Sequence, residues 1–284
     1  QTFIIYNYGP TIVCPSDETV ECYSYIHTGI PTVTTSCYLG YDVTTSGPHL
    51  VYGQVDCPDA KYEIIYTVTD DCGREASCTQ TFTIYNDPPT IVCPADETVE
   101  CYSYIHVGIP TVTTSCYLGY DVLTSGPHLV YGQADCPDSK YEIIYTVTDD
   151  CGREASCVQT FTIYNEPPTI VCSPDMTIEC VSDMVEGIAT VTTSCDLGYN
   201  VFFAIPDLVG PTINCPGNEY FILYSVEDEC GRTASCQQKF TIANDPPTIV
   251  CPADETVECY GDIHVGIPTI MVSCDLDYNI TTSG

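Results

Sequence analysis

The chain has 284 residues, and its 39 acidic residues against six basic ones give a formal net charge of −33. This charge excludes partners that are bound through many Lys and Arg side chains, namely the phosphate backbone of nucleic acids and anionic membrane surfaces. The 21 cysteines indicate a disulfide framework made in an oxidising compartment outside the cytosol. A zinc array is the alternative, but it would need Cys-x-x-Cys pairs or cysteine–histidine clusters, which this sequence lacks.

The segment from Asp87 to Cys101 recurs along the chain and marks the start of a 79-residue repeat. Its first cysteine returns with that period at positions 14, 93, 172 and 251, and its second at positions 22, 101, 180 and 259. The first two repeats differ at only seven positions, which favours a role that needs uniform geometry rather than one catalytic site. We therefore expect the last strand of a preceding repeat at 1–10, complete repeats at 11–89, 90–168 and 169–247, and a truncated repeat at 248–284.

Within the first repeat, the expected elements are all short strands. Residues 31–35 alternate between apolar and polar side chains, and so do residues 62–68 and 81–85, apart from Ile65. Clusters such as Ser46-Gly47-Pro48 and Cys57-Pro58-Asp59 predict turns between them. No helical period of useful length is present. About seven strands in 79 residues predict a small two-sheet β-sandwich.

The motifs Pro88-Pro89-Thr90-Ile91-Val92-Cys93-Pro94 and Asp70-Asp71-Cys72-Gly73-Arg74-Glu75-Ala76-Ser77-Cys78 resemble those of hyalin repeat modules, and the resemblance covers essentially the whole chain. It implies an all-β fold of tandem, disulfide-stapled, immunoglobulin-like β-sandwiches stacked end to end. It also implies an extracellular adhesion or matrix setting and no enzymatic activity. The chain departs from the family at Thr35-Ser36, where Asp-Asn is frequent, and at Tyr66, where Trp is frequent.

The implied sandwich predicts three disulfides inside each complete repeat. Cys14, Cys37, Cys72 and Cys78 would lie at its N-terminal end, and Cys22 and Cys57 at the other end, too far away to bond across. The expected pairs are Cys14–Cys78, Cys22–Cys57 and Cys37–Cys72 in the first repeat; Cys93–Cys157, Cys101–Cys136 and Cys116–Cys151 in the second; and Cys172–Cys236, Cys180–Cys215 and Cys195–Cys230 in the third.

Acidic residues near the repeat boundaries form a candidate calcium site. Clustered carboxylates are the ligands that calcium prefers, and Asn86-Asp87-Pro88 is similar to the linkers between cadherin repeats. The candidate ligands are Asp56, Asp59, Asp87, Asp149 and Asp150. The alternative is a solvated acidic surface in which aspartates favour turns. No cofactor is expected to be required, with calcium as the one candidate.

Other residue types suggest little chemistry. The five histidines, His27, His49, His106, His128 and His264, have no nucleophile at a telling spacing, so no catalytic residue is expected. The abundant tyrosines could bind glycans or neighbouring protomers, or could pack locally under loops. Asn279-Ile280-Thr281 is an N-glycosylation sequon.

These patterns predict a structural extracellular rod, a segment of a cell-surface filament or appendage. Its partners would be copies of itself or further repeats of the same chain, with glycans as another candidate. The alternative is the stalk of a cell-surface adhesin that binds a glycan or protein receptor. Residues 1–7 match a last strand and residues 248–284 match half a repeat, so we expect either an array that continues in both directions or strand exchange between chains.

Overall fold

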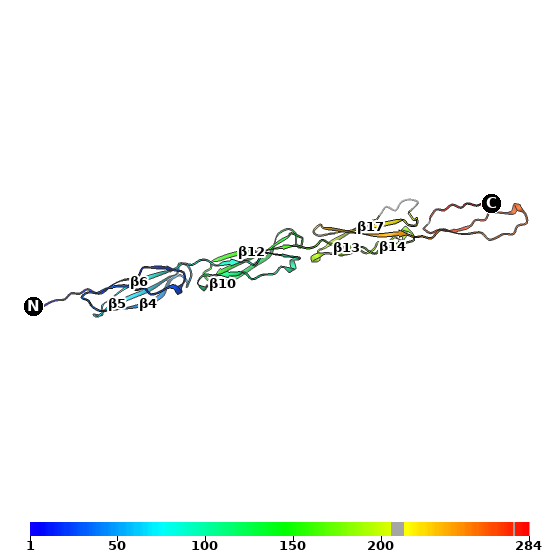
Figure 1. Cartoon of the computed structure of the whole chain (residues 1–284). Coiled ribbons are helices and arrows are strands. Elements are labelled where there is room, and N and C mark those ends of the chain that lie inside the picture. The colour runs from blue at the N-terminus through cyan, green and yellow to red at the C-terminus, as the bar shows by residue number, and fades with distance from the viewer. Residues whose placement is uncertain (206–212, 275, 284) are drawn as a thin grey trace. The chain divides into compact units, whose positions relative to one another are not determined.

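The computed structural model describes residues 1–205, 213–274 and 276–283. It is all-β and consists of tandem β-sandwich repeats (Figure 1). The strands of residues 11–89 are β1 (Thr11–Val13), β2 (Glu18–Val20), β3 (Thr32–Thr34), β4 (Tyr41–Tyr52), β5 (Lys61–Asp70) and β6 (Glu75–Ile84). Those of residues 90–168 are β7 (Thr90–Val92), β8 (Glu97–Val99), β9 (Thr111–Thr113), β10 (Tyr120–Tyr131), β11 (Lys140–Asp149) and β12 (Glu154–Ile163).

The third and fourth repeats follow the same order of elements. Residues 169–247 hold β13 (Thr169–Val171), β14 (Met176–Ile178), β15 (Thr190–Thr192), β16 (Tyr199–Ala204), β17 (Glu219–Asp228) and β18 (Thr233–Ile242). Residues 248–283 hold β19 (Thr248–Val250) and β20 (Thr269–Met271). Single 3₁₀ turns lie at Tyr23–Tyr25, Tyr102–Tyr104, Ser115–Tyr117, Val181–Asp183, Ser194–Asp196 and Tyr260–Asp262. Among the described residues no helix is long and apolar enough to cross a membrane.

The first repeat shows how each sandwich is built. A two-stranded sheet, β1–β3, packs on a four-stranded sheet of order β2-β6-β5-β4, in which β2 runs parallel to β6 and the other pairs are antiparallel. Alternation along β5 buries Tyr62, Ile64 and Tyr66 in the core, while Ile65 faces outward and is 38% exposed. Phe82 and Ile84 of β6 complete the core. The third repeat has the same sheet orders and an equivalent core.

A polar network fixes the middle of this core. The Tyr66 hydroxyl donates to Oε1 of the buried Gln80 at 2.9 Å and accepts from the Gly29 N–H at 2.9 Å. Gln80 Nε2 donates to the Ser16 carbonyl at 2.7 Å. Because each of these buried polar groups has a partner, the network specifies the packing without leaving one of them unsatisfied.

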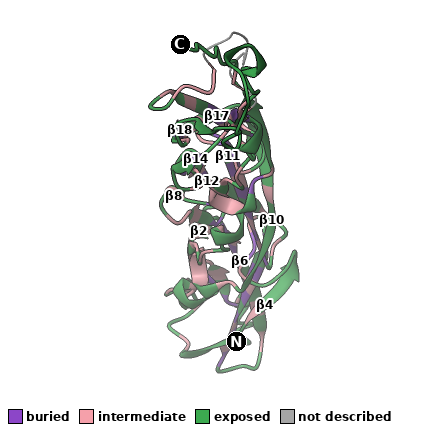
Figure 2. Cartoon of the chain, turned by 90° about the vertical axis from the view of Figure 1, so that its right-hand side faces the viewer, coloured by how far each residue is buried: buried purple, intermediate pink, exposed green. Residues whose placement is uncertain are grey.

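One predicted turn is instead part of a strand. Ser46-Gly47-Pro48 lies inside the 12-residue strand β4, where the pairing with β5 shifts register between Ser46 and His49. Gly47 has a φ of +115°, which only glycine adopts readily, so the chain bulges without turning back. The first repeat therefore has six strands where about seven were expected. Figure 2 shows β4 as mostly exposed.

The chain divides into two compact units whose limits do not follow the sequence repeats. Unit 1 comprises residues 1–97, 105–131 and 140–162, and unit 2 comprises residues 98–104, 132–139 and 163–284. Unit 1 therefore holds the first repeat and most of the second, whereas unit 2 holds two loops of the second repeat together with the third and fourth repeats. The bonds that cause this grouping form the candidate site.

Candidate functional site: disulfide junctions between repeats

The first class of disulfides lies inside single repeats, as predicted. Cys14–Cys78, Cys93–Cys157 and Cys172–Cys236 each join residues 64 apart in sequence, with Cα atoms 5.7 Å apart. In the first repeat the bond ties Cys14, the residue directly after β1, to Cys78 in β6, and both cysteines pack against the apolar core.

The second class joins one repeat to the next, which the sequence analysis did not predict. Five bonds connect cysteines 94 residues apart: Cys22–Cys116, Cys57–Cys151, Cys101–Cys195, Cys136–Cys230 and Cys180–Cys274. Their Cα separations of 5.3–5.5 Å are typical of disulfides. Each bond links a cysteine of the Cys22 or Cys57 type to one of the Cys37 or Cys72 type in the following repeat.

Six of the nine predicted pairs are therefore wrong. These are Cys22–Cys57, Cys37–Cys72, Cys101–Cys136, Cys116–Cys151, Cys180–Cys215 and Cys195–Cys230. The grouping of cysteines by sandwich end did not by itself fix their partners, because the next repeat follows without a spacer. The end that carries Cys22 and Cys57 is thus bonded to the start of the next repeat. Cys37, Cys72, Cys215, Cys251 and Cys259 are unpaired in the described chain.

The first junction, within unit 1, comprises the two bonds Cys22–Cys116 and Cys57–Cys151 and the residues around them. Cys22 and Cys57 are only 8% and 6% exposed, so one sulfur of each bond is shielded from solvent. Cys116 has a φ of +56°, in the left-handed region that a cysteine rarely adopts. This backbone conformation, within the 3₁₀ turn Ser115–Tyr117, belongs to the bonded cysteine of the second repeat.

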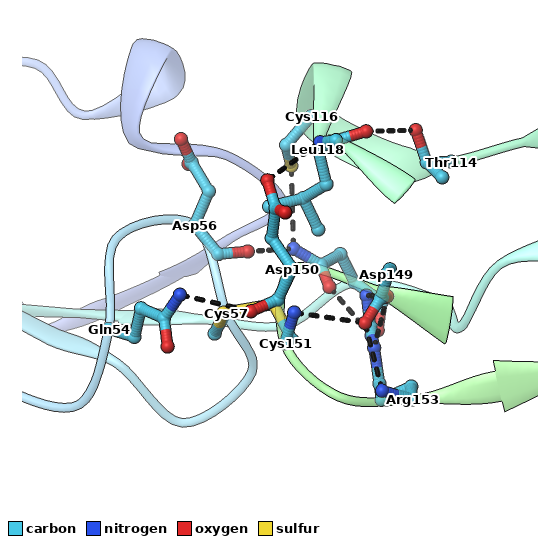
Figure 3. Close-up of polar contacts among 12 residues, drawn as sticks. Gln54, Asp56, Cys57, Thr114, Cys116, Leu118, Asp149, Asp150, Cys151 and Arg153 are labelled. Carbon is cyan, nitrogen blue, oxygen red and sulfur yellow. Dashed lines mark hydrogen bonds and ion pairs between the residues drawn. A yellow bond between two sulfur atoms is a disulfide. The ribbon is translucent and has the colours of Figure 1, made fainter. Parts of the chain in front are cut away.

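A hydrogen-bonded arginine joins the two repeats beside these disulfides (Figure 3). Arg153 Nη1 donates to the carbonyl oxygen and to Oδ1 of Asn86, at 3.0 and 2.9 Å. Its Nε and Nη2 reach Asp149 Oδ2 at 2.8 and 2.7 Å. Asn86, at the end of the first repeat, is 6% exposed and in turn donates from Nδ2 to the Asp56 carbonyl at 2.7 Å. One arginine thus connects the last residues of one repeat to the Asp149–Arg153 turn of the next.

Asp149 is held in its ionised form. Burial disfavours the charged carboxylate, but the backbone N–H of Arg153, its guanidinium and the Cys151 N–H outweigh burial and lower the pKa of Asp149. At the equivalent position of the first repeat, the hydrogen bond from the Arg74 guanidinium lowers the pKa of Asp70. Both turns therefore keep a charged pair at neutral pH.

A third contact crosses the first junction. Gln54 Nε2 donates to the backbone carbonyl of Asp150 at 3.0 Å (Figure 3). In turn, the Asp150 N–H donates to the Gly119 carbonyl at 3.0 Å, and the Gly119 N–H donates to Asp150 Oδ2 at 2.9 Å. The loop that carries Asp150 is thus held by hydrogen bonds to Gly119 within its own repeat and by Gln54 of the preceding repeat.

The second junction, within unit 2, repeats this arrangement. Its disulfides are Cys101–Cys195 and Cys136–Cys230. Arg232 Nη1 donates to the carbonyl oxygen and to Oδ1 of Asn165 at 3.0 and 2.8 Å, and its Nε donates to Asp228 at 2.8 Å. Gln133 Nε2 donates to the Glu229 carbonyl at 3.1 Å. The same contacts therefore form where Glu229 replaces Asp150, because the acceptor is a backbone carbonyl.

The five candidate calcium ligands do not assemble a site. Asp149 pairs with Arg153, Asp150 Oδ2 accepts from Gly119, and Asp56 Oδ1 accepts from the Tyr23 N–H. Asp59 lies in a turn with a φ of +64°, and Asp87 lies beside the groove described below. In the ranges that the structure describes, no group of three or more His, Cys, Asp or Glu side chains is placed to hold a metal ion. Backbone N–H groups and arginine engage three of these carboxylates instead.

The histidines lie on the surface in local contacts. His27 packs edge-on against Phe82 with ring centroids 6.1 Å apart and lies 3.9 Å from Glu18, and His49 shares a hydrogen bond with Ser46. His264 lines a cavity of about 390 Å³ in the fourth repeat. Asn279 is exposed, so the sequon there stays a prediction.

A groove lies beside the first junction and another beside the second. In unit 1 it has a volume of about 510 Å³ and is lined by Tyr25, Asp87, Thr113, Ser115 and Tyr117. Tyr117 is fully exposed, and Tyr25 is 58% exposed. In unit 2 the corresponding groove of about 560 Å³ has Asp196 in place of Tyr117.

The sequence analysis missed Gln54, Asn86 and the arginine as junction residues. A signal for two of them exists, because Asn7, Asn86, Asn165 and Asn244 recur with the 79-residue period, as do Arg74, Arg153 and Arg232. A polar residue kept at one position in every repeat, beside the boundary, is what a contact between repeats requires.

Comparison with known proteins gives no family. No protein-family model matches the chain, and no curated protein matches it. The resemblance to hyalin repeats therefore stays a prediction.

Among solved structures, the chain is similar to the protocadherin GammaB4 extracellular domain, with 12% identity and a TM-score of 0.35 over 87% of this chain and 52% of that one. Drosophila N-cadherin EC1-4 matches with 10% identity and a TM-score of 0.30 over 85% of this chain and 76% of that one. Human CDH23 EC21-23 matches with 12% identity and a TM-score of 0.30 over 82% and 100%. The chain spans about half the length of the protocadherin GammaB4 structure, and likenesses this low establish neither family nor function.

Proposed function

We propose that this chain is a segment of an extracellular structural filament, in which the disulfides carry tension from repeat to repeat. The supporting observation is the connectivity of the bonds. Cys14–Cys78 bridges most of the first repeat, and the short segment from Cys78 to Cys93 then leads to the next bond of this class, Cys93–Cys157. A covalent route that follows these bonds therefore bypasses most of the chain in each repeat.

The bonds between repeats provide two further routes. From Cys22–Cys116 the chain leads back over a short segment to Cys101, which is bonded to Cys195. From Cys57–Cys151 it leads back over a segment of the same length to Cys136, which is bonded to Cys230. Three covalent routes therefore connect the first, second and third repeats, and each uses an equally short segment of chain per period. A pulling force is shared among them, and breaking one bond leaves two routes intact.

This arrangement limits how far the array can be stretched. Each connecting segment, such as the one from Cys78 to Cys93, reaches roughly 50 Å when fully extended, so no repeat can lengthen beyond that while any one route is intact. With all bonds reduced, the segment that Cys14–Cys78 encloses becomes extensible and adds roughly 230 Å per repeat. An extracellular setting fits these disulfides because structural disulfides form and persist mainly in oxidising compartments. The repeat boundaries given above, and further repeats of the same chain as partners, are part of this proposal.

Single-molecule stretching of the whole chain tests the proposal. With handles at Gln1 and Gly284, the oxidised chain should show no unfolding step that releases the segment enclosed by Cys14–Cys78, whereas the chain in reductant should show one such step per complete repeat. Replacing Cys14, Cys78, Cys93, Cys157, Cys172 and Cys236 by Ser removes one route. If that oxidised variant lengthens by more than roughly 50 Å per repeat, the reach of one connecting segment, the routes between repeats do not carry the load.

The grooves favour a second candidate, an adhesive stalk that binds glycans. Exposed rings such as Tyr25 and Tyr117 can pack on a sugar, while Asp87 and the neighbouring hydroxyl groups can bind its polar groups. Binding of the chain to a glycan array, lost in Tyr117→Ala and kept in a variant at an exposed tyrosine outside the groove, Tyr52→Ala, would support this function. Absence of glycan binding would leave the filament as the single proposal.

A further inference from the structure

At each junction, two cysteine-bearing turns of the later repeat bond to the preceding repeat, and we call these two turns the acceptor. The first repeat has the same two turns, but their cysteines, Cys37 and Cys72, have no partner within the described chain. Cys37 and Cys72 are exposed and unpaired, whereas Cys116 and Cys151, their equivalents in the second repeat, are both bonded to the preceding repeat. The same residue types in the same turns therefore form disulfides elsewhere in this molecule.

The acceptor is already in its bonded conformation. Cys37 has a φ of +58°, against +56° for the bonded Cys116 and +57° for the bonded Cys195. The Gly40 N–H donates to Asp71 Oδ2 at 2.8 Å, as the Gly119 N–H does to Asp150 at 2.9 Å. A left-handed cysteine is uncommon, and Cys37 shares this backbone conformation with the two bonded cysteines.

Residues 1–7 already make one of the contacts that the end of a repeat makes at a junction. Arg74 Nη1 donates to the carbonyl oxygen and Oδ1 of Asn7 at 2.9 and 2.8 Å, as Arg153 does to Asn86. Residues 1–7 also match residues 80–86, in which Phe82 and Ile84 are completely buried. Their equivalents, Phe3 and Ile5, are 77% and 82% exposed. The first seven residues thus dock on the acceptor as the end of a repeat does, with their apolar side chains uncovered.

We infer that this surface binds one further repeat of the same 79-residue type, of which residues 1–7 are the last strand. That repeat supplies a Cys22-type cysteine to Cys37 and a Cys57-type cysteine to Cys72. Its Gln54-type amide donates to the Asp71 carbonyl, the equivalent of the Asp150 carbonyl that accepts from Gln54. Each bond forms by oxidation of two thiols, with two electrons and two protons passing to an external disulfide or to oxygen in the extracellular compartment. The inference rests on the proposed function and names the partner of this end.

A second copy of the 284-residue chain is a poorer partner. The acceptor needs both cysteines from one repeat, whereas the unpaired cysteines of the required types, Cys259 and Cys215, belong to different repeats. A second copy could therefore form one of the two bonds at most. The occupant that satisfies both cysteines is one complete repeat of the same type.

The test is a chain extended by a copy of residues 87–158 placed directly before Gln1, so that residues 1–7 become the last strand of the added repeat. After oxidative folding, free thiols are alkylated and the disulfides are mapped by mass spectrometry without reduction. Thr44 and Thr79 distinguish the peptides of Cys37 and Cys72 from those of the second repeat, which carry Leu123 and Val158. The first junction, Cys22–Cys116 and Cys57–Cys151, is the control within the same molecule.

The inference predicts that Cys37 and Cys72 lose their reactivity toward alkylation and are recovered linked to peptides with the Cys101 and Cys136 sequences, while peptides with these two sequences are also recovered linked to Cys195 and Cys230 of the third repeat. It is overturned if they stay reactive, or bond to each other, while Cys22–Cys116 and Cys57–Cys151 form. A covalent dimer of the unextended chain through Cys37 and Cys259 also overturns it, in favour of a second copy. If the control bonds are themselves missing, the proposed function fails together with it.

Discussion

Arg153→Met tests whether the buried ion pair holds the first junction together. The Asp149 side chain is fully buried, and that of Arg153 is 20% exposed. Removing one partner of a buried pair typically costs about 3–5 kcal/mol. Asp149 would keep the backbone N–H groups of Cys151 and residue 153, at 3.0 and 2.9 Å, so the lower end applies, about 3 kcal/mol. Asn86 would lose both of its bonds from the guanidinium as well.

Native-state hydrogen exchange read by mass spectrometry measures this loss locally, which suits a multidomain chain that need not unfold in one step. A loss of about 3 kcal/mol corresponds to about 150-fold faster exchange in the peptides that cover Asn86 and the end of β11. Lys140→Met is the matched control, since it removes one positive charge from the exposed start of the same strand. Unchanged exchange in Arg153→Met, or an equal increase in Lys140→Met, would refute the reasoning.

Three further outcomes are expected. The pKa values of Asp70 and Asp149 are lowered in the folded chain, so their contribution to stability is complete above the ordinary aspartate pKa of about 3.9 and is lost as pH falls through the lower folded values. Acid unfolding of the unaltered chain should therefore begin below about pH 3.9. In Arg153→Met it should begin at a higher pH than in the unaltered chain. Replacing Cys57 and Cys151 by Ala opens the loop that runs from Cys57 to Cys93, across the intact Cys93–Cys157 bond and back to Cys151. For this loop of roughly 40 residues the chain-entropy relation predicts that the free energy of unfolding falls by about 4 kcal/mol. Denaturant unfolding, followed by a spectroscopic signal from unit 1, measures this change. A fall of less than about 1 kcal/mol would contradict the cross-link. Since three of the five candidate carboxylates are already engaged, a calcium chelator at physiological salt should leave the thermal midpoint unchanged, and a drop of several degrees would restore the calcium hypothesis.

Much of the sandwich could be predicted because it depends on local sequence. Alternation along residues 62–68 and 81–85 placed the central strands β5 and β6, which bury Tyr66 and Phe82. Cys14–Cys78 followed from those strands, since both cysteines lie on neighbouring elements of one repeat. The bulge at Gly47 was read as a turn, because a glycine before a proline favours both and only the pairing of β4 with β5 distinguishes them.

The junction could not be predicted from the pattern alone. In a strict repeat, Cys22 has the same sequence context whether it bonds to Cys57 or to Cys116, so the 79-residue period cannot separate the two pairings. The deciding fact is spatial: the next repeat begins directly after Asn86, and its Asp149–Arg153 turn contacts that residue. The acidic residues suggested a calcium site for a related reason. The sequence does not show that backbone N–H groups and Arg153 already engage Asp149 and Asp150.

Disulfide mapping of the native, unreduced chain tests the central claim most directly. Proteolysis and mass spectrometry should recover the peptide of Cys22, marked by Ser16 where the second repeat has Ala95, linked to that of Cys116, marked by Leu123. The peptide of Cys57 should likewise be linked to that of Cys151. Recovery of Cys22 bonded to Cys57 would contradict the account, because each repeat would then be closed on itself and only one covalent route would remain.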